Sequence, residues 1–194
     1  MLSYEKSLKI LKETNALLDG HFKLSSGLHS SQYVQCAQLL SKPNKSAEFC
    51  KSLAEKISNK IEEFDLILSP AMGGIIIGYE LGRLLKKETI FSERVEGQFK
   101  LRRGFNILKT SKVLIVEDVI TTGKSSIECS KLIEIAGAKI IGFACLIDRS
   151  NGNSLINKEI ISQIQINIPT YRENDLPDNL ISLPVIKPGS REIT

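Results

Sequence analysis

The chain has 194 residues, 42% hydrophobic and 25% charged, which is long enough for one domain with a substantial core. The net charge of +4 includes no Lys/Arg block, so the sequence offers no polybasic arm for nucleic acid or a membrane surface. No apolar run approaches the roughly 18 residues of a membrane span, and the N-terminus lacks the apolar segment of a signal peptide. We therefore expect no nucleic-acid partner and no membrane partner.

The cysteines are widely spaced and show no metal-ligand pattern. Most of them fall on apolar faces of expected helices or in an expected strand, which is typical of reduced core thiols. This usage predicts a cytoplasmic location. The residues concerned are Cys36, Cys50, Cys129 and Cys145.

The N-terminal third is predicted to form a helix, a β-hairpin and a second helix. Leucines at helical spacing predict an amphipathic helix over 3–18, with Ser3 as its N-cap. Residues 20–40 alternate and contain glycines and serines, which predicts a strand, a turn and a second strand. Pro43 and Asn44 interrupt the pattern, and Asn44 is suited to cap a helix that follows over 45–63.

From residue 65 the sequence alternates between strands and helices. It predicts strands over 65–69, 88–92, 112–117 and 139–147, and helices over 74–87 and 124–136, the last ending at Gly137. Such repeats imply an α/β fold with a parallel sheet flanked by helices. Ligands of these sheets bind beyond the carboxyl ends of the strands.

Two segments do not follow this repeat. Residues 93–111 lack periodicity and carry basic residues, among them Arg94 and Arg103, so we expect a functional loop or a β-arm there. Ordinary solvated charges are the alternative. The tail over 151–194 contains one alternating strand, Gln163–Ile168, followed by proline-rich irregular chain.

The most informative segment is 113–125, in which a β-branched strand ends in Glu117 and Asp118 and then turns into a helix. Carboxylates accept hydrogen bonds from ribose hydroxyls, and the N–H groups of a turn and a helix N-terminus hold phosphate. We therefore expect a sugar-phosphate site, although both acids could instead cap the turn. A nucleotide P-loop is excluded because Asp118 stands where its first glycine is required. The turn consists of Thr121, Thr122, Gly123, Lys124 and Ser125, of which Lys124 could also point into solvent.

A second small-residue turn follows the expected strand 65–69. Ala71 and Gly73 lie in the run Ser-Pro-Ala-Met-Gly-Gly, whose small side chains permit close backbone approach to an anion. A plain connection between strand and helix is the alternative.

Segment 113–125 resembles the 5-phosphoribosyl-1-pyrophosphate (PRPP) motif of type I phosphoribosyltransferases. Segment His21–Ser30 is similar to the substrate segment of the orotate members of that family, and the resemblance covers most of 17–150. It implies one phosphoribosyltransferase domain over 1–194, with a core of approximately 44–150 and a small hood of approximately 1–43 plus 151–194. It also implies an enzyme that transfers the phosphoribosyl group of PRPP to orotate, giving orotidine 5′-monophosphate and pyrophosphate in pyrimidine biosynthesis. A purine-base phosphoribosyltransferase and a non-catalytic PRPP-binding regulator remain open.

The resemblance also implies roles for residues, a cofactor and an assembly. Glu117 and Asp118 would lie against the ribose hydroxyls, residues 121–125 would hold the 5′-phosphate, and Ala71 and Gly73 would approach the pyrophosphate. Arg94 and Arg103 would act on the leaving group, and Arg149 on the orotate carboxylate, unless it merely pairs with Asp148. Mg²⁺ would be held mainly by PRPP without direct side-chain ligands, and the chain would form a homodimer with a shared active site. The base segment comprises Lys23, Ser25, Ser26 and Gly27.

Three departures from the family pattern bear on these roles. Some orotate enzymes carry lysine where this chain has Gly73, and many carry lysine where it has Ser25. The arm also lacks the Lys-x-x-x-Lys-x-His pattern of many relatives, as in a shorter-looped branch. Pyrophosphate binding would therefore depend more on backbone donors, and Lys23 could replace the lysine absent at Ser25.

Overall fold

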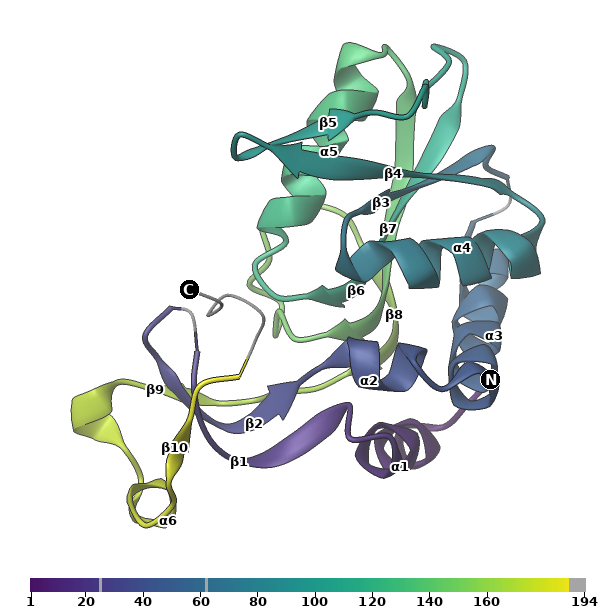
Figure 1. The fold of residues 1–194 in the computed structure, drawn as a ribbon. Coiled ribbons are helices and arrows are strands. Elements are labelled where there is room, and N and C mark those ends of the chain that lie inside the picture. Colours follow the sequence, from purple (N-terminus) through teal and green to yellow (C-terminus); the bar gives the residue numbers. More distant parts are fainter. Residues whose placement is uncertain (25, 62, 189–194) are drawn as a thin grey trace.

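The computed structural model describes residues 1–24, 26–61 and 63–188. Its central feature is a six-stranded sheet of order β5-β4-β3-β6-β7-β8, in which neighbouring strands are parallel except for the antiparallel pair β4 and β5 (Figure 1). The expected α/β architecture is confirmed. The strands are β3 (Leu66–Pro70), β4 (Glu88–Val95), β5 (Gln98–Leu101), β6 (Lys112–Ile120), β7 (Lys139–Asp148) and β8 (Ile160–Gln165).

Helices cover both faces of this sheet. α3 (Pro43–Lys60) and α4 (Gly73–Leu85) pack on one face, and α5 (Lys124–Ile135) packs on the other. Because side chains alternate along a strand, Leu114 and Val116 of β6 join the core beneath α3 and α4. Val113 and Ile115 join the core beneath α5. The same alternation governs the two acids that follow.

The central sheet includes two segments that lie outside the predicted strand–helix repeat, the arm after β4 and a strand of the tail. Residues 93–101 form a β-arm, since β4 runs to Val95 and returns as β5. β8 pairs with β7 in the central sheet, so residues 160–165 belong to the core rather than to the hood. The tail strand also begins three residues earlier than the expected Gln163–Ile168, because its pairing with β7 sets its limits.

The N-terminal elements differ in detail from the sequence pattern. Ser3 caps α1 (Tyr4–Glu13), and its Oγ accepts a hydrogen bond from the Lys6 N–H at 3.2 Å. The helix ends well before residue 18 because Asn15 adopts a left-handed φ of 57°. The next helix, α3, begins at Pro43 with Lys42 as N-cap, so Asn44 does not cap it; proline suits the first helical position.

A second, small sheet forms the hood from both ends of the chain. Its order is β10-β1-β2-β9, and β1 and β2 form the expected hairpin. The tail supplies both edges, since β10 pairs with β1 and β9 pairs with β2. The hood elements are β1 (Leu17–Lys23), β2 (His29–Val34), α2 (Cys36–Leu40), β9 (Thr170–Tyr171), the 3₁₀ turn η1 (Glu173–Asp175), α6 (Asp178–Ile181) and β10 (Val185–Ile186).

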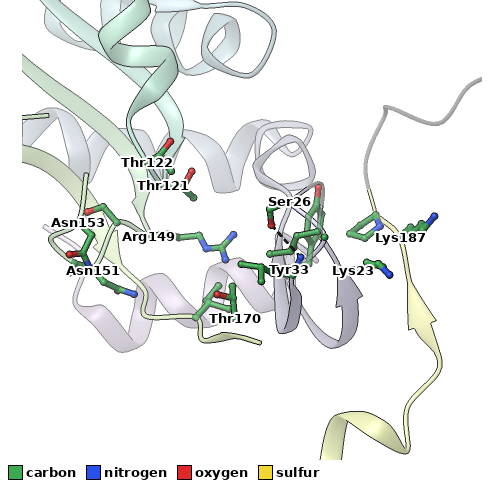
Figure 2. Close-up of a pocket in the computed structure, with 16 residues that line it drawn as sticks. Lys23, Ser26, Tyr33, Thr121, Thr122, Arg149, Asn151, Asn153, Thr170 and Lys187 are labelled. Carbon is green, nitrogen blue, oxygen red and sulfur yellow. Dashed lines mark hydrogen bonds between the residues drawn. The ribbon is translucent and has the colours of Figure 1, made fainter. Parts of the chain in front are cut away.

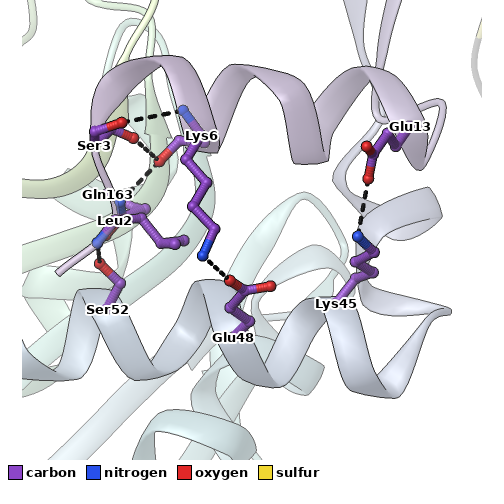
Figure 3. A network of polar contacts seen from close by, with 9 residues as sticks. Leu2, Ser3, Lys6, Glu13, Lys45, Glu48, Ser52 and Gln163 are labelled. Carbon is purple, nitrogen blue, oxygen red and sulfur yellow. Dashed lines mark hydrogen bonds and ion pairs between the residues drawn. The ribbon is translucent and has the colours of Figure 1, made fainter.

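Polar contacts attach α1 to the core (Figure 3). Lys6 Nζ pairs with Glu48 of α3 at 2.7 Å, an exposed pair that contributes little. Gln163 Nε2 of β8 donates to Ser7 Oγ at 3.0 Å in a buried bond, which fixes the helix more effectively. Within the described ranges, none of the helices is long and apolar enough to cross a membrane.

A glycine stripe on α4 sets its distance from the sheet. A Cβ on Gly78 would overlap Ser69 Oγ, a buried hydroxyl without a partner among the described residues. Gly78→Ala is therefore expected to lower the free energy of unfolding by about 1–3 kcal/mol through overpacking. Urea unfolding measures this, and Ser69→Ala in the same chain should recover part of the loss. Unchanged stability of Gly78→Ala would show that α4 can move away at no cost.

Candidate active site

The turns after three neighbouring strands converge at the carboxyl edge of the central sheet. The Arg149 N–H, after β7, donates to the Ile120 carbonyl at 2.8 Å, and the Leu155 N–H donates to the Thr122 carbonyl at 2.8 Å. The turn after β3 reaches the same edge, where Gly73 adjoins Asp118. The topology therefore brings the acid-tipped strand, the Ala71–Gly73 turn and the segment around Arg149 to one place, as expected for a parallel sheet.

Glu117 points to the α5 side of β6 and is buried. Ser126, in the first turn of α5, donates its hydroxyl to Glu117 Oε1. Burial raises the pKa of Glu117 to about 7, the Ser126 hydrogen bond opposes that rise, and the charge of Asp118 adds to it. The alternative is that both acids cap the following turn, and Glu117 does bond a residue just after that turn, in the first turn of α5.

Asp118 points to the opposite face, toward α4. Its Oδ1 accepts the Val119 N–H at 2.9 Å, and burial raises its pKa while that backbone bond opposes the rise. A Cβ on Gly73 would lie 2.7 Å from each carboxylate oxygen, so only glycine admits the acid at the N-terminus of α4. The two adjacent acids therefore diverge, because neighbouring residues of a strand face opposite ways.

The turn between β6 and α5 has the form that phosphate binding requires. Gly123 adopts a left-handed φ of 73° and is the N-cap of α5, and no side chain caps that helix. Within the turn, the Lys124 N–H at the start of α5 donates to Thr122 Oγ1 at 3.3 Å, a long hydrogen bond, and the positive end of the helix dipole suits an anion. Thr121, Thr122 and Lys124 are exposed and Ser125 is half-buried.

A cavity of about 1030 Å³ lies between this turn and the hood (Figure 2). Thr121 and Thr122 line it on one side, and Figure 2 shows Arg149 projecting into the space from β7. Among the base-segment residues, Lys23, Ser26 and Gly27 line the cavity, whereas Ser25 lies outside the described residues. Gly27 has a φ of 83° within the β1–β2 turn, a conformation that favours glycine.

Arg149 is a half-buried cation, and no carboxylate of the described residues forms an ion pair with it. Its Nε is enclosed and has no hydrogen-bond partner. Burial lowers its pKa, with Tyr33 opposing. Asp148 instead accepts bonds from the Ser150 N–H at 2.8 Å and from Gln165 Nε2 at 3.2 Å. The alternative of a local Asp148–Arg149 ion pair is therefore wrong, and the guanidinium remains available to an anionic ligand.

The structure does not bring the two arm arginines into this cavity. Arg94 Nη2 pairs with Glu128 Oε2 of α5 at 2.6 Å, and Arg103 Nε pairs with Glu93 Oε1 of the same arm at 2.8 Å. Ala71, Gly73, Gly123, Lys124 and Ser125 also lie outside the cavity lining, near the acids and the α5 N-terminus. The role of the arm in leaving-group departure stays a prediction.

Several residues that line the cavity were not predicted from the sequence. Asn151, Asn153, Thr170 and Lys187 line the cavity. The asparagines flank Gly152 directly after Arg149, a turn signature that could have indicated a binding loop. Thr170 and Lys187 carry no local signal, since they reach the cavity only through the strand pairs that close the hood.

Comparison with known proteins decides the family. The model of the phosphoribosyl transferase domain matches residues 37–175. The orotate phosphoribosyltransferase of Parvibaculum lavamentivorans is 47% identical over 193 residues, which cover 99% of this chain and 100% of that protein. The chain belongs to the orotate phosphoribosyltransferase family.

Solved structures extend the likeness to the fold. The orotate phosphoribosyltransferase of Aeropyrum pernix superposes with a TM-score of 0.71 at 23% identity, covering 81% of this chain and 92% of that one. The adenine phosphoribosyltransferase of Thermoanaerobacter pseudethanolicus gives 0.61 at 20% identity, with 70% and 88% covered. At such identities these two show the type I phosphoribosyltransferase fold alone.

Proposed function

We propose that this chain transfers the 5-phosphoribosyl group of PRPP to orotate, giving orotidine 5′-monophosphate and pyrophosphate in pyrimidine biosynthesis. The observation that carries the proposal is one cavity with Thr121 and Thr122 on one wall and Arg149 on another (Figure 2). The phosphate-binding turn suits the 5′-phosphate, and the unpaired guanidinium suits the carboxylate of orotate. The name of the 47% identical relative supports the same substrate.

The chemistry needs no protein nucleophile. As pyrophosphate departs, the ribose C1 gains positive charge, which the carboxylates of Asp118 and Glu117 would stabilise through position and charge. Arg94 and Arg103 would act on the leaving group after exchanging Glu128 and Glu93 for pyrophosphate oxygens. Closure of the arm would then exclude water from the site.

Mg²⁺ is the cofactor we propose for this reaction. In residues 1–24, 26–61 and 63–188 no group of three or more His, Cys, Asp or Glu side chains is placed to hold a metal ion. A hard cation prefers oxygen ligands, which PRPP supplies through its pyrophosphate and ribose hydroxyls. The ion would therefore be held mainly by the substrate, where it neutralises charge on the leaving group.

A spectrophotometric assay of orotate consumption with PRPP and Mg²⁺ tests the proposed function. We expect turnover that depends on all three components, with none when adenine or hypoxanthine replaces orotate. Turnover of a purine but not of orotate would make the chain a purine-base enzyme. Salt-dependent nucleic-acid binding without pyrophosphate release would indicate a PRPP-binding regulator instead.

A homodimer with a shared active site is the assembly we propose. An apolar stripe on α4 supports it, since Met72, Ile76 and Tyr79 are 83%, 53% and 69% exposed beside Gly73. We expect Ile76→Glu to dissociate the dimer in light scattering, because a charge would be buried in the contact. Ile135→Glu, at an 83% exposed position on α5, is the matched control. Retention of the dimer by both variants would place the contact elsewhere.

A cytoplasmic location is also proposed. All four cysteines are free and buried, which is typical of proteins kept in a reducing compartment.

A further inference from the structure

Glu117 depends on one residue of α5 for its side-chain hydrogen bond. Ser126 is fully buried, and its hydroxyl donates to Glu117 Oε1. No other side chain of the described residues bonds this carboxylate. The next buried serine of the helix, Ser130, instead donates to the Ile127 carbonyl of its own helix at 2.8 Å. Ser126 is thus the serine of α5 that reaches across to the acid-tipped strand.

We propose that Ser126 is a positioning residue that favours the ionised form of Glu117 and fixes its orientation, so that the ribose of PRPP meets a preformed acceptor. The proposal rests on the proposed function, in which Glu117 contacts the ribose. A hydroxyl donated to a carboxylate stabilises its charged form and fixes one of its oxygens. The remaining oxygen can then accept a hydrogen bond without a search among side-chain rotamers.

Ser126 supplies Glu117 with two donors, its hydroxyl and its backbone N–H, and the surroundings of the carboxylate make the hydroxyl important. Asp118 adds a negative charge from the same strand, and the thiols of Cys145 on β7 and Cys129 on α5 face the carboxylate. Burial raises the pKa of both thiols, so they stay neutral near pH 7. Among the described residues, no cation opposes the rise in the pKa of Glu117. Without the Ser126 hydroxyl, the carboxylate would take up a proton at a higher pH.

The test is the pH profile of kcat/KM for PRPP in Ser126→Ala. We expect the acidic limb to move up by about one pH unit, with a loss of about fivefold near pH 7 that approaches about tenfold at lower pH and disappears toward about pH 9. A merely structural defect would lower the profile at every pH. Ser126→Cys, a weak donor of similar size, should fall between the two profiles. Ser130→Ala should overlay the wild type.

A second measurement does not need turnover. The pKa of Glu117 is about 7 in the folded chain against 4.5 as the ordinary value, so the folded state binds the extra proton between them. This contribution to stability is fully present below pH 4.5 and is lost as pH rises through about 7. In Ser126→Ala the loss should extend to higher pH, and Glu117→Gln should abolish it in both backgrounds.

A failure of the proposed function and a failure of the positioning role of Ser126 would give different results. If the wild type does not consume orotate with PRPP, the proposed function fails, and urea unfolding against pH still decides whether Ser126 favours the ionised form of Glu117. If the wild type is active and Ser126→Ala overlays it in both measurements, the positioning role of Ser126 is wrong. A pH-independent loss of activity in Ser126→Ala would overturn it as well.

Discussion

Replacing Arg149 by methionine is expected to lower kcat/KM for orotate by about two orders of magnitude, or about 2.7 kcal/mol of transition-state stabilisation. The loss should appear mainly as a higher KM for orotate, because the guanidinium binds a carboxylate that does not change during the reaction. Steady-state kinetics at saturating PRPP measure it.

The same substitution should act in the opposite direction on the unliganded protein. Arg149 is half-buried, its Nε is enclosed without a hydrogen-bond partner, and burial lowers its pKa, so the folded state bears an uncompensated desolvation cost. We therefore expect Arg149→Met to leave the free energy of unfolding unchanged or higher. Arg172→Met, which removes an exposed arginine of the hood, is the control. A destabilised Arg149→Met with normal KM would make Arg149 a structural residue.

Asp118→Asn is expected to keep the fold and to lower kcat at least about tenfold, or about 1.4 kcal/mol. The amide oxygen can still accept the Val119 N–H, and its size still fits against Gly73. What is lost is the negative charge that would stabilise the cationic ribose. Because protonation has the same effect, wild-type kcat should fall toward acid pH, and the variant should lose the part of that fall that Asp118 contributes while the part due to Glu117 remains.

The control for Asp118→Asn is Glu134→Gln, which removes an exposed carboxylate from α5. Unfolding curves of both variants should match the wild type, so that any loss of kcat is attributable to the site. Equal kcat for Asp118→Asn and wild type would rule out a role for its charge.

Much of the core could be predicted because its signals are local. The β–α repeat, the Ser3 cap and the left-handed Gly137, with a φ of 70°, depend on residues close together in the chain. The acid-tipped strand and the turn after it are also local, and both appear where expected. The divergence of Glu117 and Asp118 follows from strand alternation, but their partners Ser126 and Gly73 do not.

What the tertiary structure decided involves residues far apart in the chain. His21 pairs with Val185 and His29 with Tyr171, and these pairs bring tail residues to the cavity that Arg149 enters. The helical spacing of apolar residues in the sequence extends through Leu17, yet in the structure Leu17 forms the first pair of the hairpin, with Val34. Periodicity and capping report the conformation of neighbours, and so the sequence by itself determined the α/β core and the acid-tipped strand with the turn after it. The hood, the partners of the two acids and the unpaired state of Arg149 depend on packing between distant segments, which no local pattern encodes.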